Sequence, residues 1–212
     1  MRILFISDVH ERCDLIATLP SADLLLVGGD IAYSELMWAM FRFAVADYMT
    51  KTKTPQCCYV LGNHDVYTPE SLLPRGSLEC IMNHHVQYQG FDIAGLGYSW
   101  ETEEFLLSSL QAIGKADILL SHAPPFNTQS DYSDYGGFNP TFPTQVNHLG
   151  SVAIKNYLIK QKPRLMCVGH IHEGKGVERI EQTVVVNAGT LEKGYALINI
   201  NKSIKVELVN RS

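Results

Sequence analysis

Five short apolar runs, each ending abruptly at polar residues, constrain this sequence more than any other feature. They occupy residues 3–7, 24–29, 57–62, 118–121 and 165–169. Each run is continuously apolar rather than alternating, which is typical of strands that are buried on both faces of a parallel sheet. The residues that follow the runs are acids, amides and histidines, so the chemically useful groups gather where strands are expected to end.

Helix signals lie between the runs. Ser34, Thr102 and Ser151 can each cap the N-terminus of a helix, and Pro163 would end the third helix. One face of the first helix would carry core residues, namely Met37, Met40, Phe41, Ala44, Val45 and Tyr48. Strands that alternate with helices predict βαβ units and a mainly parallel sheet. Because ligands bind outside the carboxyl ends of such strands, the polar residues should meet in one site.

Three further stretches differ from this pattern. Residues 86–97 are typical of two strands around a turn, and residues 176–209 of a strand-turn-strand series. These segments add antiparallel strands, so a second sheet or an extended edge is expected. Residues 123–150 are rich in Pro, Gly, Asn and Thr and have no clear periodicity. They predict a long loop that is either functional or disordered.

Composition excludes several classes of function. The chain has 212 residues, with 17 Lys and Arg against 22 Asp and Glu and a net charge of −5, which argues against constitutive binding to nucleic acid. No run of about eighteen apolar residues occurs, so no membrane span is expected. The five cysteines form no C-x-x-C pair, which argues against a disulfide framework or a thiolate zinc site. We expect a reducing, cytoplasmic compartment.

The strand ends carry a set of metal-ligand types with nitrogen and oxygen donors. Its members are Asp8, His10, Asp30, Asn63, His122, His170 and His172. A set without thiolates suits Mn, Fe, Co, Ni or Zn. Seven donors are too many for one tetrahedral ion and fit two ions that share a bridge, for which the two oxygens of an Asp are suited. Asp8 and His10 are two residues apart, as are His170 and His172, so each pair can reach one site.

The order of these residues resembles the calcineurin-like metallophosphoesterase superfamily. The matching blocks are Asp8-Val9-His10, Gly29-Asp30, Gly62-Asn63-His64-Asp65, Ser121-His122-Ala123-Pro124-Pro125 and Gly169-His170-Ile171-His172. The flanking residues look most like the small Icc-related phosphoesterases, a group that includes class III cyclic-nucleotide-phosphodiesterase-like proteins. The resemblance implies an α/β fold, a four-layer α/β/β/α sandwich of two mixed β-sheets flanked by helices. We expect residues 1–212 to form a single metallophosphoesterase domain.

The resemblance also implies a role for each matching residue. Asp8, His10 and His172 would bind one metal ion. Asn63, His122 and His170 would bind a second ion, and Asp30 would bridge both. His64 would contact the substrate phosphate and help the leaving group, and Asp65 would orient His64.

These roles predict a metal-dependent phosphoric ester hydrolase with two divalent ions, Mn being favoured. A metal-bridged hydroxide would attack phosphorus in a small phosphodiester, with cyclic nucleotides among the candidates, or in a phosphomonoester. The alternatives are a catalytically silent scaffold or binding protein of the same fold, and a nuclease of the same superfamily. The expected binding partner is therefore a small phosphate-ester substrate. We expect neither constitutive binding to nucleic acid nor association with a membrane, and the oligomeric state is open.

Substrate contacts are expected from two places. Asn63 and His64 lie in the G-N-H-D block, and residues 123–150 leave the site directly after His122. This segment carries Tyr132, Tyr135, Phe138 and His148, which could contact the leaving group and form a specificity wall. The alternative is a passive surface loop.

Overall fold

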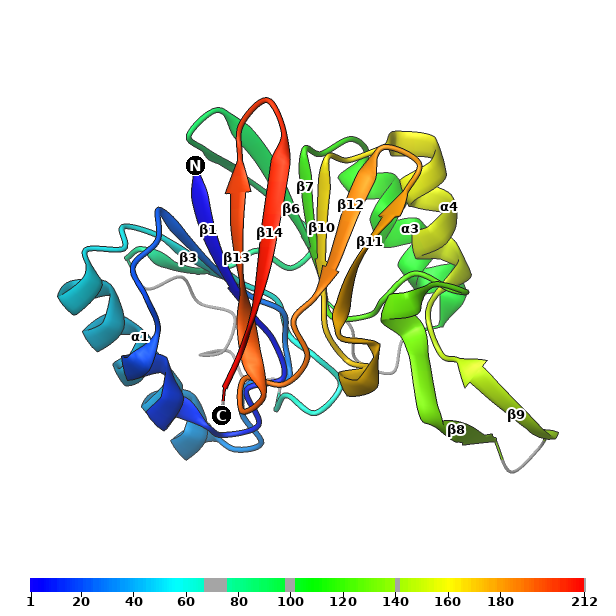
Figure 1. The fold of residues 1–212 in the computed structure, drawn as a ribbon, viewed down its shortest axis with the longest axis horizontal. Helices are drawn as coiled ribbons and strands as arrows, with labels where there is room; N and C mark the ends of the chain where they lie inside the picture. The colour runs from blue at the N-terminus through cyan, green and yellow to red at the C-terminus, as the bar shows by residue number, and fades with distance from the viewer. Residues whose placement is uncertain (67–75, 98–101, 140–141, 212) are drawn as a thin grey trace.

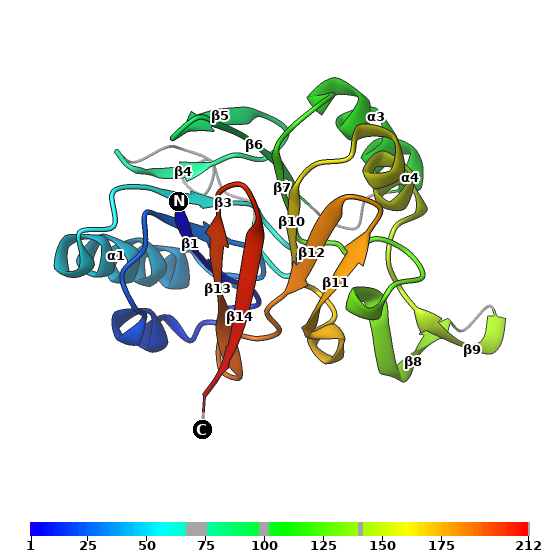
Figure 2. The same cartoon turned by 45° about the horizontal axis from the view of Figure 1, so that its top comes forward.

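Two six-stranded mixed β-sheets face each other in the computed structural model, which describes residues 1–66, 76–97, 102–139 and 142–211 (Figures 1 and 2). The first sheet has the order β14-β13-β1-β2-β3-β4. Its strands are β1 (Arg2–Ile6), β2 (Leu24–Val27), β3 (Cys57–Tyr59), β4 (Leu78–Cys80), β13 (Gly194–Ile200) and β14 (Ile204–Asn210). The second sheet has the order β11-β12-β10-β7-β6-β5. Its strands are β5 (His85–Tyr88), β6 (Phe91–Leu96), β7 (Ile118–Ser121), β10 (Leu165–Val168), β11 (Gly176–Ile180) and β12 (Thr183–Asn187).

The centre of each sheet is parallel, and antiparallel strands extend the first sheet at its β14 edge and the second sheet at both edges. β1, β2, β3 and β4 pair in parallel in the first sheet, as do β6, β7, β10 and β12 in the second. Antiparallel pairing adds β13 and β14 to the first sheet, and β5 and β11 to the second. This confirms the antiparallel strands expected for residues 86–97 and 176–209.

Alternating burial explains why the central runs are apolar throughout. In β1, Ile3 and Phe5 pack between the two sheets, whereas Leu4 and Ile6 pack toward α1 (Glu35–Thr52). The 3-10 helix η1 (Cys13–Thr18) contributes to the same outer layer. The helices α3 (Glu103–Ile113) and α4 (Val152–Gln161) cover the outer face of the second sheet (Figure 2). The predicted four-layer α/β/β/α arrangement is confirmed.

The helices begin where the sequence predicted. The hydroxyls of Ser34, Thr102 and Ser151 each accept a hydrogen bond from the backbone N–H three residues later. One detail of the first helix was wrong. Met40 is 48% exposed, and Trp38, which is 1% exposed, packs in the core instead. The buried face of α1 therefore follows Trp38, Phe41, Val45 and Tyr48.

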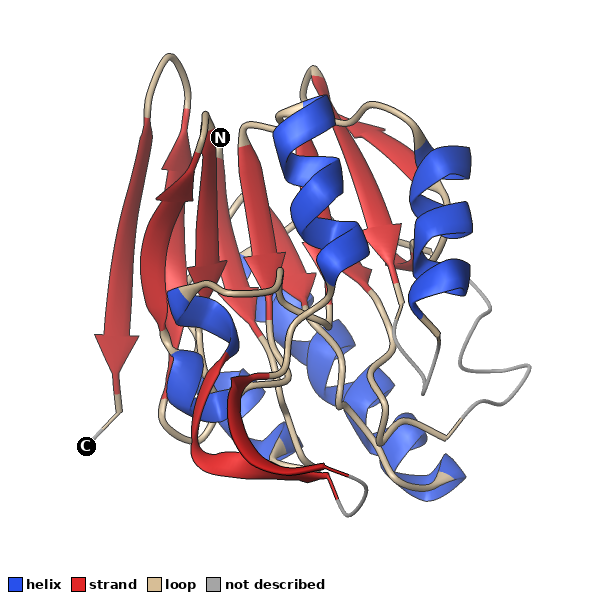
Figure 3. Ribbon diagram, turned by 90° about the vertical axis from the view of Figure 1, so that its right-hand side faces the viewer, coloured by secondary structure: helices blue, strands red, loops and turns tan. Residues whose placement is uncertain are grey.

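The loop expected over residues 123–150 contains secondary structure, which corrects that prediction. The short helix η2 (Gln129–Asp131) leads into an antiparallel hairpin of β8 (Tyr132–Asn139) and β9 (Phe142–His148). The hairpin projects away from the two sheets (Figures 1 and 3). Its pairing shifts register on both sides of Gly137, and such irregularities hide the two-residue period that identifies a strand. Among the described residues, no helix has the length and apolarity that crossing a membrane requires.

Candidate metal centre

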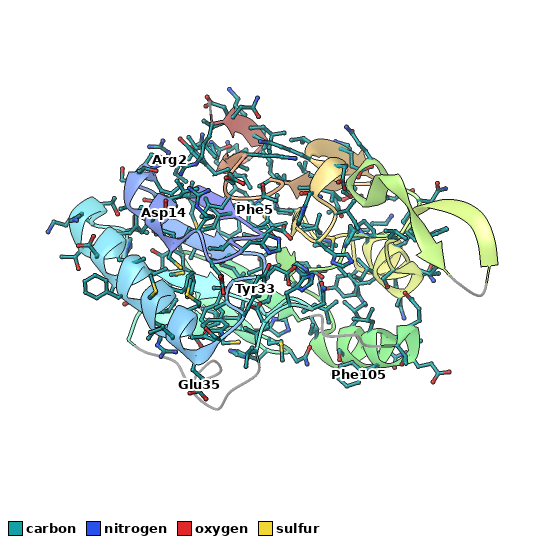
Figure 4. All side chains as sticks on the ribbon, turned by 90° about the horizontal axis from the view of Figure 1, so that it is seen from below. Arg2, Phe5, Asp14, Tyr33, Glu35 and Phe105 are labelled. Carbon is teal, nitrogen blue, oxygen red and sulfur yellow. The ribbon has the colours of Figure 1, made fainter. Side chains whose placement is uncertain are left out.

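The loops that follow β1, β2, β3, β7 and β10 meet at one edge of the two sheets. Figure 4 looks onto this edge, with Tyr33 near its middle. The loops are joined by backbone hydrogen bonds, which include Asp8 N–H to the Gly29 carbonyl (3.0 Å) and His10 N–H to the Asp30 carbonyl (2.9 Å). The sequence prediction that the strand ends converge is therefore correct for these loops.

Four of the predicted ligands have left-handed backbone conformations. Their φ angles are 50° at Asp8, 43° at His10, 50° at Asp30 and 69° at His170. Asp and His adopt this region more readily than most residues, but it still costs free energy. Strained residues of this kind cluster at functional sites, so the local conformation and the residue types point to the same edge.

The first group of ligand atoms comes from Asp8, His10 and His172. One candidate atom from each residue lies within 4.8 Å of the others. The two Nε2 atoms of His10 and His172 are 3.0 Å apart, and Nε2 of His172 lies 3.3 Å from Oδ1 of Asp8. Two imidazole nitrogens and a carboxylate oxygen thus converge on one point, as three ligands of a single ion would.

The second group comes from Asp8, Asp30 and His122, whose candidate atoms also lie within 4.8 Å of one another. Nε2 of His122 is 3.4 Å from Oδ1 of Asp30 and 3.0 Å from Oδ1 of Asn63. Nδ1 of the fully buried His122 donates to the Gly28 carbonyl at 2.7 Å. A histidine ligand held in this way presents Nε2 to a metal.

His170 completes the gathering of the seven predicted ligands. Its backbone N–H donates to both carboxylate oxygens of Asp8, at 3.2 Å each. Its ring centroid lies 5.1 Å from that of His122. Asp8 belongs to both groups of ligand atoms, whereas the resemblance assigned the shared position to Asp30. The bridging role of Asp30 stays a prediction.

Electrostatics at this edge favours a bound cation. Burial, the largest single effect, disfavours the charged form of Asp30, but the hydrogen bond and positive charge of His122 together with the N–H and charge of His64 outweigh it, and the pKa of Asp30 lies well below its usual range. Burial likewise opposes ionisation of Asp8, and the hydrogen bond with His172 lowers its pKa. Burial lowers the pKa of His170 to about 4, so this imidazole is neutral near pH 7. Two buried carboxylates beside several imidazole nitrogens fit a divalent ion of intermediate hardness, which would replace the proton that His122 holds in the metal-free site.

His64 lies at the mouth of the site and its side chain is exposed. Its backbone N–H donates to Oδ1 of Asp30 at 2.9 Å, which fixes the loop beside that carboxylate. Its ring centroid is 6.0 Å from the ring of His10 and 5.6 Å from the ring of Tyr33. The position is compatible with the predicted contact with substrate.

Tyr33 belongs to the site and was missed by the sequence analysis. Its hydroxyl is hydrogen-bonded to Nδ1 of His10, and its ring packs beside His64. Burial, and then the negative charge of Asp30, raises the pKa of Tyr33 to about 12, so the phenol stays protonated. The available signal was an aromatic residue in the loop that follows Gly29-Asp30, just before the helix cap Ser34.

Asp65 contacts the backbone of two neighbouring loops. Oδ1 accepts hydrogen bonds from the N–H groups of Ile31 (2.7 Å) and Ala32 (2.8 Å), and Oδ2 accepts from Gly62 (2.7 Å). Burial raises the pKa of this carboxyl to about 6, against the three N–H groups that favour its charged form. These bonds position the loop that carries His64 rather than its imidazole. The role of Asp65 in orienting His64, which the resemblance implies, therefore stays a prediction. The described contacts would allow Asp65 to act on His64 only indirectly, by positioning the loop.

The predicted substrate residues of the hairpin are placed only by their backbone. Tyr132, Tyr135 and Phe138 lie on β8 and His148 on β9, and their side chains are outside the described residues. The base of the hairpin is tied to the site, because Nδ2 of Asn187 donates to the carbonyls of Ser130 (3.2 Å) and Ile171 (2.8 Å). Ile171 lies between two predicted ligands, so the hairpin starts beside the metal centre.

Comparison with known proteins identifies the class. The model of the calcineurin-like phosphoesterase family matches residues 1–174, and the chain belongs to this family of metal-dependent phosphoesterases. It is 27% identical to an uncharacterized protein of Methanocaldococcus jannaschii, over 97% of this chain and 95% of that protein. It is 26% identical to human metallophosphoesterase domain-containing protein 1, over 93% of this chain and 68% of the relative.

Solved structures share the fold. The protein TT1561 of Thermus thermophilus has a TM-score of 0.59 at 17% identity and covers 98% of both chains. Purple acid phosphatase PPD1 from yellow lupin seeds has a TM-score of 0.54 at 15% identity, over 99% of this chain and 52% of the phosphatase. At these identities the likeness concerns the fold alone.

Proposed function

We propose that this protein is a phosphoesterase that uses two divalent metal ions to hydrolyse a small phosphodiester or phosphomonoester. The main observation behind this proposal is that two groups of ligand residues lie at the carboxyl edge of the two sheets and share Asp8. Within each group, the candidate ligand atoms lie within 4.8 Å of one another. Membership in the calcineurin-like family supports the same reaction class.

The residues divide between two ions. Asp8, His10 and His172 would hold one ion, and Asn63, His122 and His170 the other. We keep Asp30 as the bridge that the resemblance implies, and Asp8, which belongs to both ligand groups, lies within reach of the same position. Bound ions of this kind supply an activated water nucleophile and neutralise charge on the phosphoryl oxygens. Carboxylate and amide oxygens together with imidazoles suit Mn²⁺, which we favour within the Mn, Fe, Co, Ni and Zn series.

His64 and Tyr33 act outside this ligand set. The exposed imidazole of His64 is positioned to donate a proton to the leaving oxygen, or to stabilise charge on the phosphoryl group. An Nδ1–H of His10 donated to the Tyr33 oxygen leaves the lone pair of Nε2 directed toward His172 and Asp8. Tyr33 is therefore a positioning residue for His10.

The alternatives make different demands on the chain. A catalytically silent scaffold would show loss of ligands, and all seven positions keep a side chain that can bind metal. A nuclease would need a basic groove along the substrate path, and the net charge of −5 gives no support for one. A cytoplasmic location is part of the proposal, supported by five cysteines that are all buried and free.

The test combines metal analysis with a substrate panel. Metal-stripped protein is reloaded with single defined ions and assayed on bis-p-nitrophenyl phosphate, p-nitrophenyl phosphate, 2′,3′- and 3′,5′-cyclic nucleotides, and a short oligonucleotide. We expect metal-dependent turnover with two bound ions. Asp30→Asn should lose bound metal, and turnover should fall by roughly three orders of magnitude or more, as when a cooperating set is broken. Asp47→Asn, on the outer surface of α1, is the matched control.

The outcomes separate these candidate functions. Two bound ions without hydrolysis of any substrate would favour the scaffold. Near-normal turnover and metal content in Asp30→Asn would disprove the dinuclear assignment. Exclusive activity on the oligonucleotide would favour the nuclease.

A further inference from the structure

A basic cavity lies at the end of the sheets opposite the metal centre. It has a volume of about 350 Å³ and lies where β10 begins and where the β11–β12 and β13–β14 turns meet (upper end in Figure 1). Its lining residues are Lys162, Arg164, Arg179, Gln182, Val184, Lys202, Ser203 and Ile204. β10 runs from this end to the loop of His170, so the cavity and the metal centre are separated by about one strand length, roughly 15 Å.

The charge of this cavity is unusual for the chain. Within the described part of the chain, its lining includes two lysines and two arginines and no acid, although the whole chain has a net charge of −5. Two acids are adjacent in sequence to lining residues: the carboxylate of Glu178 accepts hydrogen bonds from Gln129 and Ser130, and Glu181, in the same turn as Gln182, is exposed. Clustered cations repel one another, so such a cluster is stabilised when an anion enters it.

The two arginines are held in place before any ligand binds. The guanidinium of Arg164 donates to the Asn201 carbonyl and lies 5.5 Å from the centre of the Phe91 ring. Nη1 of Arg179 donates to the Gln182 carbonyl at 3.2 Å. Both contacts use only part of each guanidinium, which has five N–H donors. Pre-positioned arginines lose less side-chain entropy when they bind a planar or tetrahedral oxyanion.

The walls of the cavity are also fixed. Oγ1 of the buried Thr183 donates to the Pro163 carbonyl at 2.6 Å, which ties the β11–β12 turn to the start of β10. The N–H of Ser203 donates to Oδ1 of Asn201 at 3.0 Å, which closes the β13–β14 turn. Val184 and Ile204 add apolar surface to the lining. A cavity with fixed cations and an apolar part is suited to a small organic anion.

We propose that the basic cavity binds a small phosphorylated ligand at a site separate from the metal centre. An arginine guanidinium can donate two parallel hydrogen bonds to two oxygens of one phosphate. The ammonium groups of Lys162 and Lys202 add positive charge and can bind a phosphate in several orientations. The volume lies near the lower end of the range of small-molecule pockets, about 300–1,000 Å³, so the ligand has the size of a sugar phosphate or a nucleoside monophosphate. This inference does not depend on the function proposed for the metal centre.

The test follows binding at both sites in zinc-loaded protein. Inorganic phosphate, ribose 5-phosphate and AMP are titrated while backbone amide signals are recorded by NMR. Signals of residues 181–183 and 201–203 report the basic cavity, and signals of residues 62–64 report the metal centre. We expect saturable shifts in the two turns. The double variant Arg164→Gln/Arg179→Gln should weaken this binding about tenfold or more, the scale of losing charge-assisted hydrogen bonds, while the response of residues 62–64 persists.

Three further variants sharpen the result. Lys202→Gln leaves both arginine contacts in place, so it should weaken ligand binding without lowering the melting temperature. The proposal can therefore be tested with this variant even if the double variant folds poorly. Glu181→Gln removes a nearby negative charge and should tighten binding. Lys160→Gln on the surface of α4 changes net charge equally and should leave binding unchanged.

The ligands distinguish the source of the phosphate. Equal affinity for inorganic phosphate and the two esters would identify free phosphate as the ligand, whereas tighter binding of AMP would indicate that Val184 and Ile204 contact the base. The proposal is wrong if the turns respond to none of the three, or if the double variant binds them as wild type does. A response of the turns to poly-glutamate alone would also overturn it and would indicate an acidic protein partner.

Discussion

Gly62→Ala tests whether the Asp30 carboxylate must keep its position for metal binding and turnover. A β-carbon added at Gly62 would lie 2.2 Å from Oδ1 of Asp30 and 2.5 Å from its backbone nitrogen. Ordinary van der Waals contact begins at 3.4 Å, so the carboxylate or the Gly62 loop must move by about 1 Å. The loop is also held by the Gly62 N–H, which donates to Asp65, so the strain is shared between both sides of the site.

The expected cost has two parts. A displacement of about 1 Å in a catalytic group lowers turnover by about a hundredfold. Overpacking of a buried contact costs about 1–3 kcal/mol of stability, which for a chain of this size lowers the melting temperature by roughly 2–12 °C. The variant should therefore fold, bind metal more weakly and hydrolyse slowly.

The assay compares metal content, melting temperature in chelator, and hydrolysis of bis-p-nitrophenyl phosphate. Gly114→Ala, at the C-terminus of α3, is the matched control, because its φ of +66° strains an alanine while no atom lies within 4 Å of the added β-carbon. We expect this control to lose stability and keep full metal content and turnover. Full metal content and turnover within about threefold of wild type in Gly62→Ala would refute the argument that this contact positions Asp30.

Three other predictions concern neighbouring residues. His64→Ala should keep both ions and lower turnover about a hundredfold. The loss should be smaller for p-nitrophenyl esters, because their leaving groups need little protonation. Equal losses for good and poor leaving groups would exclude proton donation by His64. Tyr33→Phe should weaken metal binding by roughly 10–100-fold in a competition titration, because His10 loses its hydroxyl partner. The melting temperature should barely change, since Tyr33 is 41% exposed. In metal-free protein, burial is the largest single effect on the pKa of His122 and lowers it, but the hydrogen bond with Asp30 and the negative charges of Asp8 and Asp30 together outweigh burial and raise the pKa from 6.5 to about 9. Its stabilisation is complete below pH 6.5 and is lost as pH rises through 9, so urea unfolding in chelator should show stability falling over that window, and added metal should abolish the slope.

The convergence of the ligands was predictable because it follows from strand geometry. A run such as Leu165–Val168 is apolar on both faces, so it must be a central strand, and its polar residues must follow its end. Five such runs with parallel pairing place five polar ends at one edge. The prediction required no knowledge of which strands are neighbours.

The division of these strands between two sheets was not predictable from the same pattern. β1 and β10 have equally buried apolar residues, yet β1 belongs to the first sheet and β10 to the second. Periodicity records how deeply a strand is buried and says nothing about its partner. Tyr33 was missed for a related reason, because a contact with Nδ1 of His10 produces no recognisable spacing in the sequence. Asp65 was expected to orient His64, and its hydrogen bonds to backbone N–H groups could not be read from the sequence.

The two-sheet arrangement also explains where function can reside in this fold. Side chains along the central strands fill the space between the sheets or the space under the helices, so polar groups placed there would lack partners. On the central strands only the strand ends remain for charged residues, whereas the edge strands β11 and β14 carry charges along their length. At the carboxyl ends, loops from the two sheets contact each other. The N–H of His170, in the loop after β10 of the second sheet, donates to Asp8, in the loop after β1 of the first sheet. A metal bound by Asp8 and His172, as we propose, would therefore join the sheets, and its removal should loosen this edge before it disturbs the apolar layers.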